Sequence, residues 1–382
     1  MSDKDNFLTY LEWRGDLSFD KSPFNCVDAL IFSQLIYLNF DNLLEQPFSS
    51  QISLYSLNRN FINAGNYSER CMMGAMINDG IPGLMDQCAN SQRFGKVQVC
   101  GYVSILDRST EIQFAAATFI LPDKKHTRVI AYRGTDDSFL GWKEDFNLSY
   151  MDVIPSQKQA LIYYKKARKA LKGRFILAGH SKGGSDAIYS ALNCTPSERN
   201  KITSIYNFDG PGFKQEVIDS KTFSLIKNRI FSFYPQFSIV GMIFKHDRRF
   251  EIIHSNGKSF MQHDPFSWAV TGNKFVNDID FTDDSKFFAK SFNEWVTRLN
   301  SEEKKKFVDN LFDLCWASGK EKIADFEKEK IASTAKIFSA FSKLPSEDKK
   351  ALKENMMVFF KVFMENMPLF SIFNPKNLKL RS

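Results

Sequence analysis

The sequence predicts an α/β fold with a mostly parallel central sheet, followed by a helical extension at the C-terminus. Between residues 97 and 270, short apolar runs rich in β-formers alternate with helical segments. That alternation is typical of a parallel sheet covered by helices on both faces. From about residue 283 the chain is charged, helical in its periodicity and without strand signals. We therefore expect one domain over residues 1–282 and a helical extension over residues 283–382.

Length and charge limit the function classes. The 382 residues suffice for a large domain with an appendage. The 51 basic and 44 acidic residues leave a net charge of +7, too mild and too mixed to predict nucleic-acid binding. A slightly basic surface is compatible with transient contact with a membrane surface. The oligomeric state is left open.

The six cysteines predict neither a metal site nor a disulfide framework. They are scattered, with no CxxC pair and no histidine at a matching spacing, so we expect reduced core cysteines. The N-terminal stretch MSDKDNFLTYLEWRGD carries acids where a signal peptide needs a basic end and an apolar core. In the late apolar stretch MMVFFKVFMENMPLFSIF, Lys361 and Glu365 interrupt what would otherwise approach a membrane span. These patterns predict a cytoplasmic protein without a transmembrane segment.

The N-terminal part combines a helix with a meander of strands. Apolar positions at helical spacing predict a helix over residues 24–38. Residues 40–95 are mixed and contain turn-rich patches. Three β-rich runs then follow, at 97–106, 112–121 and 127–135, separated by short polar turns.

The central part continues the alternation. Residues 136–146 predict a loop and a short helix, and residues 156–173 an amphipathic helix that ends at Gly173. The remaining predicted elements are strand 174–179, helix 183–194, strand 204–210, helix 216–228 and strands 229–234 and 248–256. In the extension we expect helices over 301–318, 327–344 and 346–365, with Ser301 and Ser346 as N-caps.

The stretch FILAGHSKGG carries the strongest chemical signal. Gly179-His180-Ser181-Lys182-Gly183 lies between a predicted strand and a predicted helix. At such a junction, Gly-x-Ser-x-Gly holds a serine on a strained turn that projects its hydroxyl above the sheet. Gly179 and Gly183 leave room for the two backbones. The alternative is a glycine-rich turn of a nucleotide-binding fold, but neither GxGxxG nor a P-loop Lys-Ser/Thr pair is present. The pattern therefore predicts Ser181 as a nucleophile.

A serine nucleophile needs a base and an acid that orients it. Asp209 closes the strand after Ser181, at the sheet edge where catalytic groups collect; the alternative is an Asx turn or a helix cap. The histidines that follow are His246, His254 and His263. We favour His263, in QHDPFSW after the last strand, with His246 as the alternative base; His254 is expected inside the strand.

The oxyanion hole needs two backbone N–H groups. One is that of Lys182, directly after the nucleophile. The other is that of Thr135 in VIAYRGTDDS, where Gly134 lets the chain turn after a strand; the alternative is a merely polar turn. Such a site requires no cofactor and no metal.

These segments resemble the class 3 lipases of the α/β-hydrolase superfamily. The similarity is carried by VIAYRGTDDSFLGWKEDF and FILAGHSKGG. It implies that Ser181 is the nucleophile, that Thr135 belongs to the oxyanion hole and that Asp145 is structural. Residues 139–142 would belong to a lid-like segment. From residue 7 to about 270 the chain is also similar to a bacterial lipase-like family of unknown function, in YLEWRGDLSF, GWKEDFN, YNFDGPGF, SIVGM and QHDPFSW.

Two positions depart from the lipase pattern. Class 3 lipases usually carry their acid where YPQFSIVG here offers Ser238, so the acid has either moved to Asp209 or is missing. Lys182 replaces an apolar residue, and its side chain either brings a cation to the oxyanion or points to solvent.

The combined expectation is a serine hydrolase that cleaves a small-molecule or lipid ester. The alternatives are an acyl thioesterase or transferase with the same triad, and a catalytically weak scaffold or interaction protein that binds through its helical C-terminus.

Overall fold

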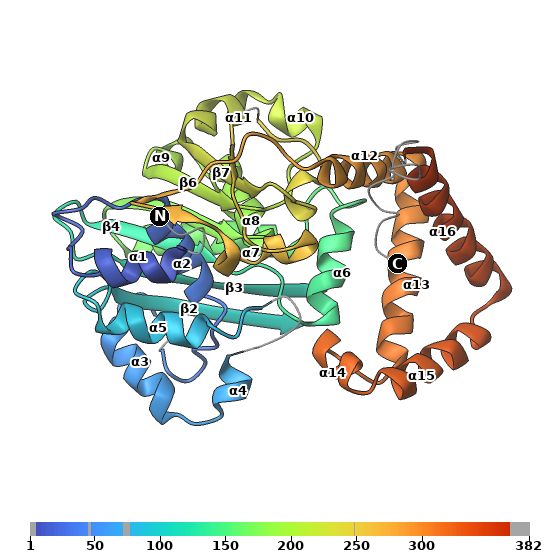
Figure 1. The fold of residues 1–382 in the computed structure, drawn as a ribbon, viewed down its shortest axis with the longest axis horizontal. Coiled ribbons are helices and arrows are strands. Elements are labelled where there is room, and N and C mark those ends of the chain that lie inside the picture. The colour runs from blue at the N-terminus through green and yellow to red at the C-terminus, as the bar shows by residue number, and fades with distance from the viewer. Residues whose placement is uncertain (1–4, 45–46, 72–76, 248, 367–382) are drawn as a thin grey trace, which may run out of the picture.

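An eight-stranded sheet forms the centre of the fold (Figure 1). The structure is a computed structural model that describes residues 5–44, 47–71, 77–247 and 249–366. The strands follow one another in the sheet in chain order, antiparallel from β1 to β4 and parallel from β4 to β8. They are β1 Ile52–Ser53, β2 Gln98–Asp107, β3 Ile112–Ile120, β4 Thr127–Tyr132, β5 Arg174–His180, β6 Ile202–Phe208, β7 Ile230–Pro235 and β8 Glu251–Ile253. The predicted fold class, a mostly parallel sheet with flanking helices and C-terminal helices, is confirmed.

The register of the central strands brings three loops to one edge of the sheet. β5 lies between β4 and β6, with Tyr132 opposite Gly179 and His180 opposite Phe208. Because these strands are parallel, the loops after β4, β5 and β6 all leave from the same edge.

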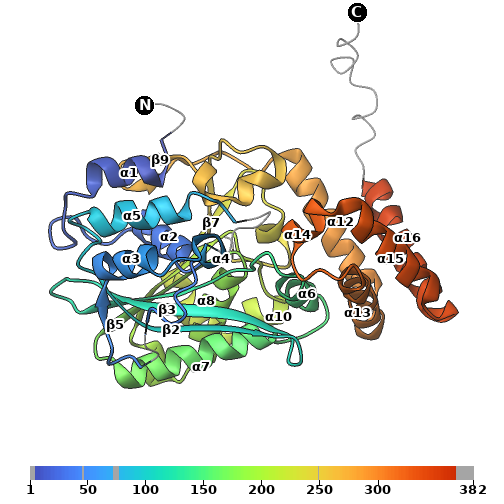
Figure 2. The same ribbon diagram turned by 90° about the horizontal axis from the view of Figure 1, so that it is seen from below.

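Helices cover both faces of the sheet (Figure 2). One apolar cluster joins one face to α1 Phe7–Arg14, α2 Cys26–Leu35, α3 Leu54–Asn63 and α5 Ile81–Asn90. A second joins the other face to α7 Pro155–Ala170, α8 Lys182–Asn193 and α11 Lys221–Ile226. Short elements complete this part: α4 Tyr67–Arg70, α9 Pro196–Arg199, α10 Gln215–Ile218, the 3₁₀ helices η1 Lys227–Arg229, η2 Val240–Met242, η3 Ser259–His263 and η4 Pro265–Ser267, and the ribbon of β9 Val270–Thr271 and β10 Lys274–Phe275.

The C-terminal helices lie beside the sheet domain and share an apolar core with α6 Phe139–Asn147 (Figure 1). They are α12 Asp283–Arg298, α13 Ser301–Ala317, α14 Ile323–Lys328, α15 Lys330–Lys343 and α16 Ser346–Asn366. Their core contains Phe139 of α6 together with Trp295 of α12 and Phe307 of α13. The division at residue 282 remains a prediction.

The predicted N-caps of two C-terminal helices are wrong by one residue. Ser301 is the first residue of α13, and Asn300 caps the helix by accepting from the N–H groups of Glu302 and Glu303. The Glu303 carboxylate in turn accepts from the Asn300 N–H, which completes a reciprocal pair of hydrogen bonds. Ser301, one residue later, does not form this pair. Ser346 likewise is the first residue of α16 and not its cap.

Two further elements differ from expectation. The helix predicted over 216–228 is divided into α10, α11 and η1, because the Ser220 hydroxyl accepts from the Phe223 N–H and starts a new helix. The strand predicted over 248–256 is reduced to β8, so His254 follows the strand and does not lie inside it. Residue 248 of that prediction lies outside the described residues.

No helix in the described part of the chain has the length and apolar character needed to cross a bilayer. Residues 367–373 of the interrupted apolar stretch lie outside the described residues. All six cysteines are free thiols, and four of them are buried.

Candidate active site

Ser181 occupies a strained turn between β5 and α8. Its φ is 57° and its ψ is −135°, a backbone conformation that residues other than glycine rarely adopt. A Cβ on Gly179 would lie 2.1 Å from the Gly183 carbonyl carbon, and one on Gly183 would lie 2.2 Å from the Tyr132 carbonyl oxygen. Both glycines are therefore required where strand and helix cross closely. We refer to this tight turn, residues 179–183, as the elbow.

Asp209 and His263 meet at the same sheet edge. Asp209 follows β6 with a φ of 51°, and its carboxylate is fully buried. The His263 Nδ1 lies 2.6 Å from the Asp209 Oδ2. An ionised carboxylate only accepts, so Nδ1 carries the proton and Nε2 is left as a proton acceptor. Within the described residues, the Ser181 hydroxyl makes no hydrogen bond to this imidazole.

Ser238 is the second partner of Asp209. Its hydroxyl donates to Asp209 Oδ1 at 2.5 Å, and it is fully buried. The backbone of Ser238 is held in turn by Ser285 of α12, whose hydroxyl accepts from the Ser238 N–H and donates to its carbonyl oxygen. Ser238 thus supports the Asp209 carboxylate, and Ser285 of the C-terminal helix α12 supports Ser238.

His180 places the His263 segment beside the elbow. The two imidazole rings lie 4.6 Å apart, and His180 Nε2 is 2.9 Å from the His263 carbonyl oxygen. Since a carbonyl only accepts, Nε2 carries the proton and Nδ1 accepts from the Tyr37 hydroxyl at 3.1 Å. Burial lowers the pKa of His180 well below its usual value, which agrees with a neutral ring. Sequence reasoning missed His180 and Tyr37, although His180 occupies the variable position before Ser181 in the motif.

The other two histidines have different partners. His246 Nδ1 lies 2.7 Å from the Tyr234 hydroxyl, and burial lowers the pKa of His246 to about 4. His254 Nδ1 lies 3.2 Å from Asp278. Of the three candidate bases, only His263 is hydrogen bonded to Asp209 within the described chain.

The turn that holds Thr135 lies against the elbow. A Cβ on Gly134 would come within 2.9 Å of the Ser181 Cβ. The Thr135 hydroxyl donates to Asp145 Oδ2 at 2.5 Å, and the Gly134 carbonyl accepts from Gln113 at 3.3 Å. Burial raises the pKa of Asp145 to about 6, although Lys182 and the Thr135 bond act in the opposite direction.

Two backbone N–H groups near Ser181 are free to bind an anion. The Thr135 N–H has no acceptor among the described residues. The Lys182 N–H belongs to the first turn of α8, where backbone donors have no partner within the helix.

The Lys182 side chain does not point to solvent, so that one of its two expected placements is wrong. It is buried beneath the elbow, where Nζ donates to Glu144 Oε2 at 2.5 Å and to Gln113 Oε1 at 2.7 Å. Burial alone would lower the pKa of Lys182, but the charges of Glu144, Asp145 and Asp186 outweigh it and raise that pKa. The lysine thus joins the elbow to β3 and α6.

The segment 139–142, expected to be lid-like, forms the first turn of α6. The Phe139 side chain is buried in the core shared with the C-terminal helices, and its N–H donates to the Glu321 carbonyl at 2.8 Å. Ser138 and Lys322 form an antiparallel bridge beside it. The segment is therefore packed beneath the C-terminal helices. In the described chain, no cluster of three or more His, Cys, Asp or Glu side chains is arranged to hold a metal ion.

The sequence profile of the Mbeg1-like family matches residues 88–313, more than half of the chain. The chain belongs to the Mbeg1-like family. This family is lipase-like, so the predicted resemblance to lipases is confirmed at family level. No curated protein matches the chain significantly.

Two solved lipase structures are similar to the chain. M37 lipase shares 15% identity and a TM-score of 0.36, over 57% of this chain and 68% of that one. The lipase of Rhizomucor miehei, solved in a propeptide complex, shares 15% identity and a TM-score of 0.31, over 56% of this chain and 75% of that one.

Proposed function

We propose that the chain is a serine hydrolase that cleaves carboxylic esters through Ser181, His263 and Asp209. The observation that carries the proposal is the 2.6 Å bond between His263 and Asp209, at the sheet edge from which the strained Ser181 turn leaves. A strained serine, an imidazole with one nitrogen held by a buried carboxylate, and two nearby backbone donors together suit acyl transfer.

The proposed reaction assigns one task to each group. The Ser181 oxygen attacks the ester carbonyl carbon while His263 Nε2 takes the hydroxyl proton. The carbonyl oxygen becomes an oxyanion that the Thr135 and Lys182 N–H groups stabilise, each donor contributing roughly 3–4 kcal/mol in the transition state. His263 then returns the proton to the leaving alkoxide, and water releases the acyl group by the same steps. The bond from Ser181 to His263 is expected to form on substrate binding, since such bonds often tighten only in the complex.

A fluorophosphonate probe tests the nucleophile. We expect covalent labelling of the wild-type protein and none of Ser181→Ala. Ser224→Ala, at an exposed serine of α11, is the matched control and should label like the wild type. Labelling that survives in Ser181→Ala, or is absent from the wild type, would refute the proposal. Matched nitrophenyl ester and thioester substrates then separate an esterase from a thioesterase, and an added alcohol acceptor reveals a transferase.

A second candidate function is an interaction protein, and exposed apolar side chains on the C-terminal helices favour it. Ile331 and Phe338 of α15 are 89% and 69% exposed. Phe360 of α16 is 59% exposed. Isolated apolar residues on a surface are common, but several on neighbouring helices suit a binding face. The double variant Ile331→Ser/Phe338→Ser should abolish binding to such a partner and leave ester hydrolysis unchanged. If the variant lost partner binding and ester hydrolysis to the same extent, a binding face separate from the candidate active site would be rejected.

A further inference from the structure

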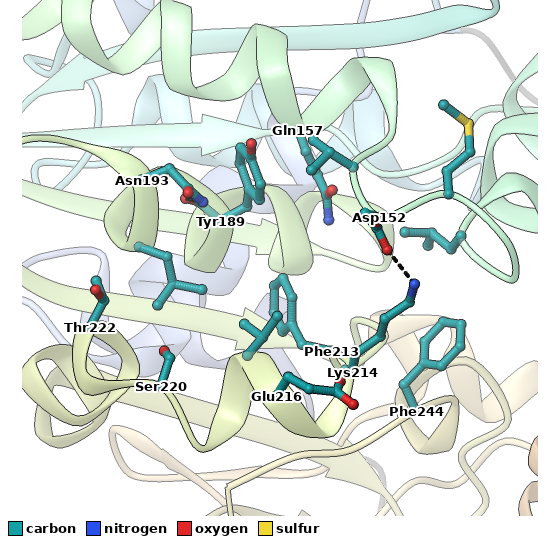
Figure 3. A pocket seen from close by; sticks show the side chains of 16 residues that line it. Asp152, Gln157, Tyr189, Asn193, Phe213, Lys214, Glu216, Ser220, Thr222 and Phe244 are labelled. Atoms are coloured by element: carbon teal, nitrogen blue, oxygen red, sulfur yellow. Dashed lines mark hydrogen bonds and ion pairs between the residues drawn. The ribbon is translucent and has the colours of Figure 1, made fainter.

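A cavity of about 650 Å³ is lined by none of the candidate catalytic residues. Figure 3 shows the side chains that line it. Its walls come from the loop after α6, from α7 and α8, from the loop after β6 and from α10 and α11. Neither Ser181, Asp209, His263 nor Thr135 lines it. Its volume is within the range of small-molecule sites in proteins.

The middle of the cavity is apolar. Tyr189 of α8 and Phe213 line it (Figure 3), together with Leu192 of α8 and Val217 of α10. Leu192 is buried, whereas the other three are only half-buried, so apolar surface is left in contact with solvent. Such a surface favours an apolar ligand, because binding removes it from water.

Opposite charges lie together at one end. Lys214 and Asp152 form an ion pair across the cavity, next to Phe244 (Figure 3). The carboxylate of Glu216 also lines this end of the cavity, beside Lys214. The lysine holds the pKa of the Asp152 carboxyl below its usual value. Both side chains are exposed, 45% for Lys214 and 85% for Asp152, so the pair is weak and easily opened by a competing ligand. At the other end, Asn193 and Thr222 are polar but uncharged.

We propose that this cavity binds an amphiphile with a single alkyl chain and a zwitterionic head group. The chain lies along Phe213 and Val217, where the walls are apolar. The head group lies at Lys214, Asp152 and Glu216, where its anion finds the lysine and its cation finds the two carboxylates. A purely anionic head group would meet two like charges there, and a purely cationic one would meet the like charge of Lys214, which selects against both. The site is independent of Ser181 chemistry and goes beyond the proposed hydrolase function.

Calorimetric titration of the full chain with dodecylphosphocholine, below its micelle concentration, tests the proposal. Dodecanoate and dodecyltrimethylammonium, with the same chain and single charges, are the comparison ligands. We expect the zwitterion to bind about tenfold more tightly than either. Ser181→Ala should bind it like the wild type, which distinguishes this site from the candidate active site.

Variants locate the site. Val217→Trp fills the cavity and should weaken dodecylphosphocholine binding about tenfold or more. Leu225→Trp, at a 64% exposed position of α11 outside the cavity, is the matched control and should bind normally. Thr222→Trp narrows the end of the cavity opposite Lys214 and should also weaken dodecylphosphocholine binding. It provides a second test in case Val217→Trp does not fold. Normal binding by both cavity variants, or equal affinity for all three ligands, would overturn the proposal.

Discussion

Replacement of Lys182 by Met tests the buried ion pair beneath the elbow. Both Lys182 and Glu144 have fully buried side chains, and Nζ lies 2.5 Å from the carboxylate. Met keeps a long apolar side chain but removes the charge, leaving the Glu144 carboxylate buried without its partner. Removal of one member of a buried pair typically costs 3–5 kcal/mol. We therefore expect Lys182→Met to lower the free energy of unfolding by about 4 kcal/mol, nearly three powers of ten in the folding equilibrium.

The assay is equilibrium unfolding in urea, with the free energy obtained by linear extrapolation. The double variant Lys182→Met/Glu144→Gln should recover most of the loss, because its buried amide carries no charge and still accepts from the Ser156 N–H, which bonds Glu144 in the wild type. Lys305→Met, at an exposed lysine that pairs with the half-buried Asp309 on α13, is the control and should change the free energy by less than about 1 kcal/mol.

Two results would refute this reasoning. One is a Lys182→Met variant no less stable than Lys305→Met. The other is a double variant as unstable as the single one, which would show that lost packing and hydrogen bonds, and not the unpaired charge, cause the damage.

Further predictions concern the acid, the base and the pH dependence. His263→Ala should reduce kcat for a nitrophenyl ester about 10³-fold, whereas His246→Ala should change it only a few-fold; the reverse order would move the base assignment to His246. Ser238→Ala should lower the free energy of unfolding by about 1–3 kcal/mol, because the buried Asp209 loses a hydrogen bond, and an unchanged urea midpoint would contradict this. Asp209→Asn/Ser238→Asp moves the carboxylate to the usual lipase position and should recover activity relative to Asp209→Asn alone. Burial raises the Asp145 pKa from 3.8 to about 6, so the native state binds the extra proton and stability falls as pH rises from about 4 to about 6. Asp145→Asn should remove this slope and raise the free energy of unfolding at pH 7 by roughly 2–3 kcal/mol, measured by urea titration across pH.

The sequence alone predicted the sheet and the elbow because both depend on local constraints. Alternating strands and helices allow few arrangements other than a covered parallel sheet. The elbow demands glycine on both sides of Ser181, since any Cβ there would collide with backbone, so the motif is visible in five consecutive residues. The position of Asp209 at the same sheet edge was predictable for a related reason: it directly follows β6, the strand that pairs with β5.

Helix boundaries were less predictable. Ser301 and Asn300 are both good N-caps, and only the reciprocal bond with Glu303 selects the asparagine. The break at Ser220 is of the same kind, because helical periodicity continues on both sides of a residue that caps the second helix.

Only the tertiary structure decided which groups meet. Three histidines follow Ser181, and the choice among them depends on the path of loops after β7 and β8, which has no local signature. Lys182 carries no sign in the sequence of its buried position, because Gln113 and Glu144 approach it from a strand and a helix 69 and 38 residues away. A charge is buried only where distant partners compensate it, and that compensation exists only once the chain has folded.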